Sequence, residues 1–314
     1  MSPGSLPLVS VVLLCHDRPQ LLVDALQSIA AQRYPKLEVL VVHNPSPHSE
    51  AIRSIVQQFP DFRLIVMPHN AGYTGGMNEG IRQATGKYIY ITEEDMVTAP
   101  DAVAAMVAYM ESDPQCAIAS GIHDDQCGVI VHAGGFIQLG GIYRLFVIGR
   151  DTPVFPPLLG PFCASYITGA MMLLRRSTIE ELGAFRQDFF MYHDDVELCV
   201  RFLRHGKTLV IVPSARAKTL ANLPTAKTSA LINFHKFKNL FATYLLHAPA
   251  GVLPEFFARY AGITLLRHMF RDPAAALALL RAEFWITANF PRLLRERKQL
   301  AASCRESVPS AITP

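Results

Sequence analysis

Two clusters of adjacent carboxyl side chains stand out in this chain. Asp194 and Asp195 follow an aromatic stretch and open a segment with helical spacing, and Glu93, Glu94 and Asp95 end an apolar run upstream. Neighbouring like charges raise each other's cost of ionisation, so two adjacent acids are more than a helix N-terminus requires. Such a pair suits a general base or a cation site. The alternative is that both acids only cap a helix.

The acids at 93–95 fall where an expected strand ends. Three carboxylates at a strand end are costly to hold together without a cation, and Mg²⁺ or Mn²⁺ could bridge one or two of them to a diphosphate. The alternative is a charged turn in which Asp95 or Thr98 caps the next helix.

A glycine-rich segment at 69–80 precedes a helical pattern. Glycine lets the backbone approach a ligand closely, and the amides at a helix N-terminus bind anions. The spacing G-x-x-G-G-x-x-x-G is neither the dinucleotide fingerprint nor a P-loop, because Tyr88 follows Gly86 and Lys87. Taken alone, the segment indicates either an anion site or a tight structural turn.

The elements that must position these residues alternate between short β-branched runs and helical patterns. This alternation predicts a mostly parallel sheet covered by helices on both faces, with ligands beyond the carboxyl ends of the strands. The expected strands are 8–15, 37–43, 63–67 and 87–92, with helices at 20–32, 49–59 and 76–84, irregular hairpins at 126–148, and further strands at 167–174 and 207–212.

The composition changes after about residue 219. The first 200 residues hold 12 Lys and Arg against 21 Asp and Glu, whereas the rest of the chain holds 17 against 5. Such segregation points to an anionic partner for the C-terminal part, and a basic amphipathic helix can lie on an anionic membrane surface. Packing of its aromatic residues onto the sheet is the alternative. The expected helices are 231–246, 254–270, 273–288 and 291–302, followed by a disordered tail at 303–314.

Composition also excludes several classes of protein. A chain that is 50% hydrophobic can bury a large core in one domain, or in one domain with an appendage. The six cysteines show no C-x-x-C spacing, so neither a zinc site nor a disulfide framework is indicated. The sequence shows no signal peptide and no apolar stretch long enough to span a membrane. We expect a cytoplasmic protein, at most peripheral on a membrane, that does not bind nucleic acid and that could form oligomers.

Three blocks of the chain together resemble family-2 glycosyltransferases over about residues 8–215. The run NAGYTGGMNEGIRQATGKYIYITEED at 70–95 is similar to the N-x-G-[FY]-x-G-G-x-N-x-G…D-x-D stretch of that family. The run TGAMMLLRRSTIEELGAFRQDFFMYHDDVELCVRFLRHGKTLVIV at 168–212 resembles a later block with G-x-F, F-F-x-Y and E-D. The opening, 9–47, resembles the first β-α-β unit. Rhamnosyltransferase-like members are the most similar.

The resemblance implies an α/β GT-A fold over residues 1–218, with a helical C-terminal region over 219–302. It implies an inverting transfer of a sugar, such as rhamnose, from a deoxythymidine- or uridine-diphosphate donor to an acceptor hydroxyl. The acceptor would be a glycan, a lipid-linked molecule or a small molecule, in polysaccharide or glycoconjugate biosynthesis.

The resemblance also assigns roles to residues. Asp195, with Asp194 beside it, takes the position of the general base. Glu93 and Asp95 take the positions that bind Mg²⁺ or Mn²⁺ and, through it, the diphosphate. The residues expected to bind the donor are His43, Asn70, Gly75, Gly76, Asn78, Glu93, Glu94, Asp95, Gly169 and Ala170.

Three positions depart from the family pattern. His43 stands where the family usually has an aspartate that reads uracil, and Glu93 stands where Asp or Asn is commoner. Thr219 lies near a position that often holds a histidine for metal or diphosphate, so Lys218 or Arg216 could neutralise phosphate instead. A catalytically silent sugar-nucleotide-binding or scaffold protein therefore remains a second hypothesis. A nucleotidyltransferase on a similar sheet is a third, but it would lack an Asp-Asp pair in this block.

Overall fold

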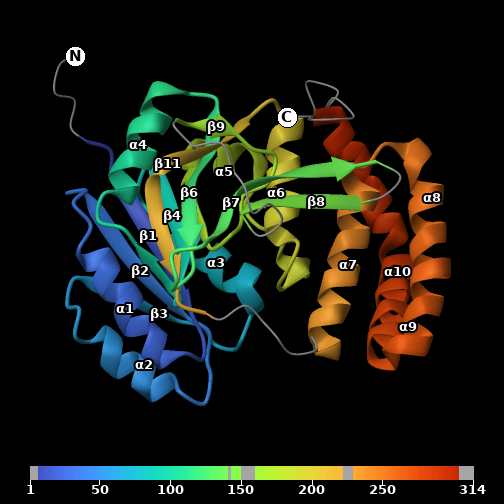
Figure 1. Cartoon of the computed structure of the whole chain (residues 1–314), viewed down its shortest axis with the longest axis horizontal. Coiled ribbons are helices and arrows are strands. Elements are labelled where there is room, and N and C mark those ends of the chain that lie inside the picture. Colours follow the sequence, from blue (N-terminus) through green and yellow to red (C-terminus); the bar gives the residue numbers. More distant parts are fainter. Residues whose placement is uncertain (1–5, 141–142, 150–159, 222–228, 304–314) are drawn as a thin grey trace.

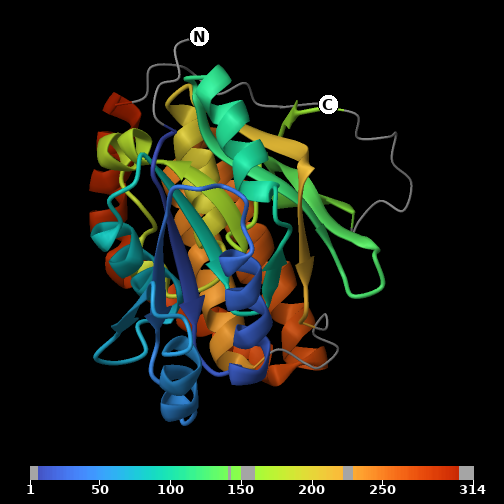
Figure 2. The ribbon, with the colours of Figure 1, turned by 90° about the vertical axis from the view of Figure 1, so that its left-hand side faces the viewer.

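The structure, a computed structural model, describes residues 6–140, 143–149, 160–221 and 229–303. A mixed β-sheet forms its centre, helices cover both faces of the sheet, and a group of C-terminal helices stands beside it (Figures 1 and 2). The described strands are β1 (Val9–Cys15), β2 (Leu37–His43), β3 (Phe62–Val66), β4 (Tyr88–Glu93), β5 (Met96–Thr98), β6 (Cys116–Asp124), β7 (Ile130–Leu139), β8 (Tyr143–Gly149), β9 (Phe162–Cys163), β10 (Met171–Arg175) and β11 (Thr208–Thr219).

The described helices alternate with these strands and then continue alone. The α-helices are α1 (Pro19–Ala30), α2 (Ser49–Val56), α3 (Gly72–Gln83), α4 (Ala102–Ser112), α5 (Arg176–Leu182), α6 (Asp194–Arg204), α7 (Ala230–His247), α8 (Leu253–Ala258), α9 (Leu265–Arg271) and α10 (Pro273–Ser303). Short 3₁₀ turns form η1 (Gln187–Phe189) and η2 (Ala250–Val252), and the π-helical turn η3 (Arg259–Thr264) joins α8 to α9.

The main path of the sheet has the strand order β3-β2-β1-β4-β10-β6-β11-β5. The first four strands are parallel, β10 runs antiparallel between β4 and β6, and β6 and β11 are again parallel. The connections reverse direction between β1 and β4, where an open α/β sheet places its ligand beyond the strand ends. The segment after Cys15 and the acids from Glu93 onward flank this point.

Alternate residues of the central strands enter two cores on opposite faces of the sheet. Val11 of β1 and Tyr90 of β4 join the core covered by α1 and α4. Val12 and Ile91, one position along, join the core covered by α3 and α6. Strands buried on both faces read as continuous apolar runs, which is why the sequence showed them clearly.

The C-terminal helices have a third core of their own. It contains Phe241 and Tyr244 of α7 and Phe256 of α8, and it also takes in Phe189, which directly precedes the Asp194–Asp195 region. The aromatic residues therefore pack mainly in this third core, which Leu139 of β7 and Tyr143 of β8 also contact, so the expected packing onto the sheet holds only in part. Among the described helices, none is both long enough and apolar enough to cross a membrane. The division of the chain near residue 218 stays a prediction.

Two expectations about individual elements were wrong. The ranges 273–288 and 291–302 form one helix, α10, because Pro291 removes a single backbone donor while Ile286 and Leu293 stay buried on either side of it. The range 126–148 contains the regular antiparallel pair β7 and β8 rather than irregular hairpins. Helix α10 ends at Ser303, and the rest of the tail expected to be disordered, 304–314, lies outside the described residues.

Gly80 tests the contact between α3 and the sheet. Glycine inside a helix normally costs about 0.5–1 kcal/mol relative to alanine. A Cβ at Gly80, however, would overlap the Val12 side chain and lie 3.0 Å from Cγ2 of Val42. We expect Gly80→Ala to lower the free energy of unfolding in urea by about 1–3 kcal/mol because it overpacks the core.

Gly262 of η3 is the control, since a Cβ there meets nothing within 4 Å. Gly262→Ala should leave stability unchanged or raise it. An equal gain in stability from both variants would contradict the close packing of α3 on β1 and β2.

Candidate active site

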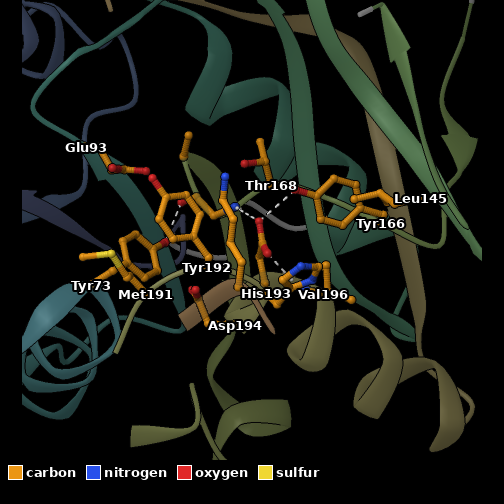
Figure 3. Close-up of a pocket in the computed structure, with 14 residues that line it drawn as sticks. Tyr73, Glu93, Leu145, Tyr166, Thr168, Met191, Tyr192, His193, Asp194 and Val196 are labelled. Atoms are coloured by element: carbon orange, nitrogen blue, oxygen red, sulfur yellow. Dashed lines mark hydrogen bonds between the residues drawn. The ribbon is translucent and has the colours of Figure 1, made fainter. Parts of the chain in front are cut away.

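A cavity of about 680 Å³ opens beyond the carboxyl end of β4, between the sheet, the start of α6 and α7. Figure 3 shows Glu93 on one side of it and Tyr166 on the other, with Asp194 between them in this view. The lining residues are Tyr73, Glu93, Leu145, Tyr166, Thr168, Gly169, Ala170, Met191, Tyr192, His193, Asp194, Asp195, Val196 and Lys236. The structure thus brings together acids that are about 100 positions apart in the sequence.

Asp195 is held in a defined orientation by groups from two segments. One carboxylate oxygen accepts the hydroxyl of Tyr166 at 2.9 Å and the backbone N–H of Gly169 at 3.3 Å. The other oxygen accepts the N–H of Val196 at 2.8 Å. Burial raises the pKa of Asp195, while these three hydrogen bonds oppose the rise. An oriented carboxylate with a raised pKa is a stronger base than one in water.

The other cavity acids are also held in a poorly solvated setting. Burial, followed by the negative charges of Asp95 and Glu94, raises the pKa of Glu93 to about 8. Burial and the adjacent Asp195 raise the pKa of Asp194 well above its usual range. Both aspartates stand in the first turn of α6, whose helix dipole favours negative charge.

Glu94 and Asp95 do not line the cavity but tie β4 to the segment after β1. The Glu94 carboxylate is buried and accepts the backbone N–H of His16 at 2.9 Å. Asp95 forms an ion pair with Arg18, whose Nη1 donates to Oδ2 of Asp95 at 2.7 Å. Arg18 therefore supplies positive charge next to the acid cluster, a contact that the sequence analysis missed.

The acidic motif can serve as part of a metal site but not as a complete one. In the described ranges, no three His, Cys, Asp or Glu side chains stand together in a way that could hold a metal ion. Mg²⁺ and Mn²⁺ prefer oxygen ligands, and Mg²⁺ is usually bound through one or two carboxylates together with waters and substrate phosphates. Glu93 and Asp95 together offer such oxygen donors, and burial followed by the charge of Asp95 raises the pKa of Glu93, a cost that a bound cation would reduce.

The segment that leads into Asp194 has a strained backbone. Phe190, Tyr192 and His193 have φ angles of 66°, 63° and 57°, a region that non-glycine residues rarely adopt. Such strain persists only where the surroundings impose it. The segment 188–193 is therefore held in place from outside.

Helix α7 supplies that restraint. The amide nitrogen of Asn239, fully buried, lies 2.9, 2.8 and 2.6 Å from the carbonyl oxygens of Phe189, Met191 and Tyr192. Lys238, from the same helix, donates to the carbonyl of Asp188. Helix α7 is thus part of the scaffold of the site.

Lys236 brings positive charge from α7 into the cavity. Its ammonium lies 4.8 Å from the centre of the Tyr192 ring, in a cation–π contact, and burial lowers its pKa. His193 also lines the cavity, and burial lowers its pKa to about 4, so its ring is neutral at neutral pH. The basic residues of this region suggested an anionic membrane surface as one alternative, but a contact between one of them and the cavity acids was not predicted from the sequence.

The glycine-rich segment packs α3 closely against the strained segment. A Cβ at Gly72 would overlap the carbonyl and the ring of Phe190, and the N–H of Thr74 donates to that carbonyl at 3.1 Å. The Asn78 amide exchanges hydrogen bonds with the backbone of Phe185 at 2.8 and 3.0 Å. These contacts agree with the structural turn that the sequence analysis kept as an alternative.

Several residues expected to bind the donor are not among those that line the cavity. The Asn70 side chain accepts the N–H of Gly72, and Gly76 faces Leu14 and Asn44 of the sheet. The ring of His43 is fully buried and bonded to Oγ of Ser49 at 2.9 Å. Gly75 and Asn78 also lie outside the set of cavity-lining residues. The donor-binding role of all five residues stays a prediction: His43, Asn70, Gly75, Gly76 and Asn78.

The residues near the end of β11 lie beside the acidic motif, since Thr219 of β11 pairs with Met96 of β5, which directly follows Asp95. Arg216 forms an ion pair with Asp124 at 2.5 Å, so its charge is already engaged. Lys218 pairs with Val97 in the same ladder and stays the candidate for the expected contact with phosphate.

The sequence of this chain matches the family described as "Glycosyl transferase family 2" over residues 10–183. It is 29% identical over 223 residues to the O-antigen biosynthesis protein RfbC of Myxococcus xanthus, covering 67% of this chain and 17% of that protein. It is 27% identical over 116 residues to the poly-beta-1,6-N-acetyl-D-glucosamine synthase of Staphylococcus epidermidis, covering 36% of this chain and 28% of the synthase. In both cases the match spans less than a third of the relative's length.

Solved glycosyltransferase structures share the fold. GalNAc-T7 with UDP, GalNAc and Mn²⁺ superposes with a TM-score of 0.66 at 15% identity, covering 92% of this chain and 58% of that one. The mannosyltransferase PcManGT from Pyrobaculum calidifontis, in complex with GDP-Man and Mn²⁺, gives 0.56 at 19% identity, covering 96% and 87%. At these identities the likeness concerns the fold alone, and the expected α/β GT-A fold is confirmed.

The restraint by Asn239 can be tested by replacing it with leucine, which has a similar size but no donor. We expect Asn239→Leu to lower the free energy of unfolding by about 1–3 kcal/mol, since the carbonyls of Met191 and Tyr192 lose this donor while that of Phe189 keeps its contact with Nδ1 of His235. Amide hydrogen exchange in 188–196 should quicken more than exchange in β1. Asn289→Leu is the control, because the hydrogen bonds of Asn289, to the Trp285 carbonyl and from Nε of Arg292, stay within its own helix. Unchanged exchange in 188–196 would show that Asn239 does not hold the segment.

Proposed function

Because this chain belongs to glycosyl transferase family 2, we propose that it transfers a sugar from a nucleotide-diphosphate donor to an acceptor hydroxyl with inversion at the anomeric carbon. One observation carries this proposal. The oriented carboxylate of Asp195 and the strand-end acid Glu93 line the same cavity. An inverting displacement needs a base on the acceptor side and charge neutralisation at the departing diphosphate.

Asp195 is the proposed general base. The acceptor oxygen forms its bond to the anomeric carbon as the bond from that carbon to the diphosphate oxygen breaks. The proton of the acceptor hydroxyl passes to the Asp195 carboxylate, which Tyr166 and Gly169 hold in place. Asp194 and Ala170 lie beside it in the cavity, near the proposed positions of the donor sugar and the acceptor.

Glu93 and Asp95 are the proposed ligands of a divalent cation on the donor side. Mg²⁺ or Mn²⁺ bound there would neutralise the negative charge of the departing diphosphate. The two solved structures with Mn²⁺ and nucleotides or nucleotide sugars support this assignment by analogy. Arg18, now paired with Asp95, would keep that carboxylate oriented until the cation arrives.

The donor that we propose is a deoxythymidine- or uridine-diphosphate sugar, with rhamnose as a candidate. The O-antigen protein and the glucosamine-polymer synthase among the relatives support a glycan or lipid-linked acceptor. Since the His43 ring is fully buried, recognition of the base would require other groups as well. We propose a cytoplasmic site of action, which suits the free thiols of Cys15, Cys116 and Cys199.

Asp195→Asn removes the proposed base and keeps the shape of the side chain. We expect transfer to fall by at least about 10²-fold, the scale of general base catalysis. Because burial raises the pKa of Asp195, transfer by the wild type should fall as the pH drops toward that raised value and the base becomes protonated. Asp101→Asn is the control, since Asp101 forms an exposed ion pair with Arg33. Equal rates for Asp195→Asn and wild type would remove Asp195 from this role.

Donor and metal preference can be measured together by thermal unfolding. Ligands that bind the folded state raise its apparent stability by mass action. We expect a deoxythymidine- or uridine-diphosphate sugar to raise the midpoint more with Mn²⁺ than with a chelator, and Asp95→Asn to abolish the difference. Glu111→Gln, which alters an acid paired with Lys87 at the surface, should preserve it. No shift and no turnover with any nucleotide sugar would favour the silent scaffold instead.

A further inference from the structure

Large apolar side chains of the C-terminal helices face outward. The exposed fraction reaches 87% for Phe270 of α9 and 76% for Phe284 of α10. Single exposed apolar residues are common on protein surfaces, but a contiguous group marks an interaction site. The other members of this apolar face are Leu231, Ile263, Leu266, Met269, Leu277 and Leu280.

These residues belong to one region of the molecule. In Figure 1 the first turns of α7, the helix α9 and the first turns of α10 lie at the same end of the helical region. An apolar hollow of about 440 Å³ joins α7 to α10 and is lined by Phe234, Leu280, Arg281, Phe284 and Trp285. Along α10, Leu277, Leu280 and Phe284 follow helical spacing and therefore share one side.

Exposed arginines stand next to these apolar residues in the sequence, and Arg281 lines the hollow. Arg267, Arg271 and Arg281 are all exposed and come from α9 and α10. Of the nearby acids, Asp272 accepts the N–H of Ala275 as a cap of α10, and Glu283 is only partly exposed. The face is thus apolar and basic, which complements a surface that is apolar beneath a layer of negative charge.

A second copy of the chain fits this face poorly. A symmetric dimer places the same patch of both protomers in contact. The patch that carries Arg267, Arg271 and Arg281 would then meet an equally basic patch. An anionic lipid bilayer instead offers phosphate groups to the arginines and acyl chains to the phenylalanines.

We propose that the apolar face docks onto the surface of an anionic lipid bilayer. Phe270 and Phe284 enter the boundary between headgroups and acyl chains, and the three arginines contact lipid phosphates. No part of the helices crosses the bilayer. This inference is independent of the proposed glycosyl transfer and concerns where the chain is held.

The test is co-sedimentation of the full chain with vesicles of phosphatidylcholine, with and without phosphatidylglycerol. We expect binding to the anionic vesicles only, and release at high salt, because salt screens the charge attraction. Phe270→Ser with Phe284→Ser should weaken binding at least tenfold. Arg267→Gln with Arg271→Gln and Arg281→Gln should do the same and remove the salt dependence.

Two controls separate this face from exposed side chains in general. Val129→Ser changes an apolar residue that is 59% exposed near β7, and Arg53→Gln changes an exposed base of α2. Both should bind as the wild type does, with unchanged thermal unfolding. Equal binding to neutral vesicles, or full binding by the double phenylalanine variant, would overturn the proposal. So would a dimer in solution that the double variant dissociates, since a second copy would then occupy the face.

Discussion

Burial of neighbouring carboxyl groups in one cavity is the constraint on which the site depends. Glu93 at the end of β4 and Asp194 and Asp195 at the start of α6 share one poorly solvated cavity, and burial raises the pKa of each. The dipole of α6 and the hydrogen bonds from Tyr166 and Gly169 offset this cost. The positively charged side chains of Arg18 and Lys236, next to the acids, also offset it. A bound cation would add further positive charge beside these carboxylates, as the proposed chemistry requires.

The compensation works only if the segment before α6 is held still. That segment carries three non-glycine residues with positive φ, and Asn239 of α7 contacts three of its carbonyls. On its other side Gly72 of α3 leaves no room for a Cβ. Helix α3 and helix α7 therefore contact the same strained segment through different carbonyl groups. The helical region is a structural support of the site as well as the carrier of the exposed apolar face.

The sequence predicted the elements whose signal is local. Apolar strands, and acids that follow them, could be placed because strand ends of a parallel sheet meet at one edge. It could not predict Tyr166 or Asn239, since their importance arises from contacts with distant backbone. Asn78, which the resemblance places among the donor-binding residues, exchanges hydrogen bonds with the backbone of Phe185, a long-range contact that the local motif did not predict. Pro291 was read as a helix boundary, but packing on both sides keeps α10 continuous.

The central claim is that one bound donor is contacted by both acid clusters. A crystal of the full chain with Mn²⁺ and a nucleoside diphosphate, measured at a wavelength where manganese scatters anomalously, tests it most directly. The account predicts a single strong anomalous peak that contacts the carboxylates of Glu93 and Asp95, with the diphosphate extending toward Asp195. A manganese peak bound elsewhere, or a nucleotide in a separate cavity from Asp195, would contradict it.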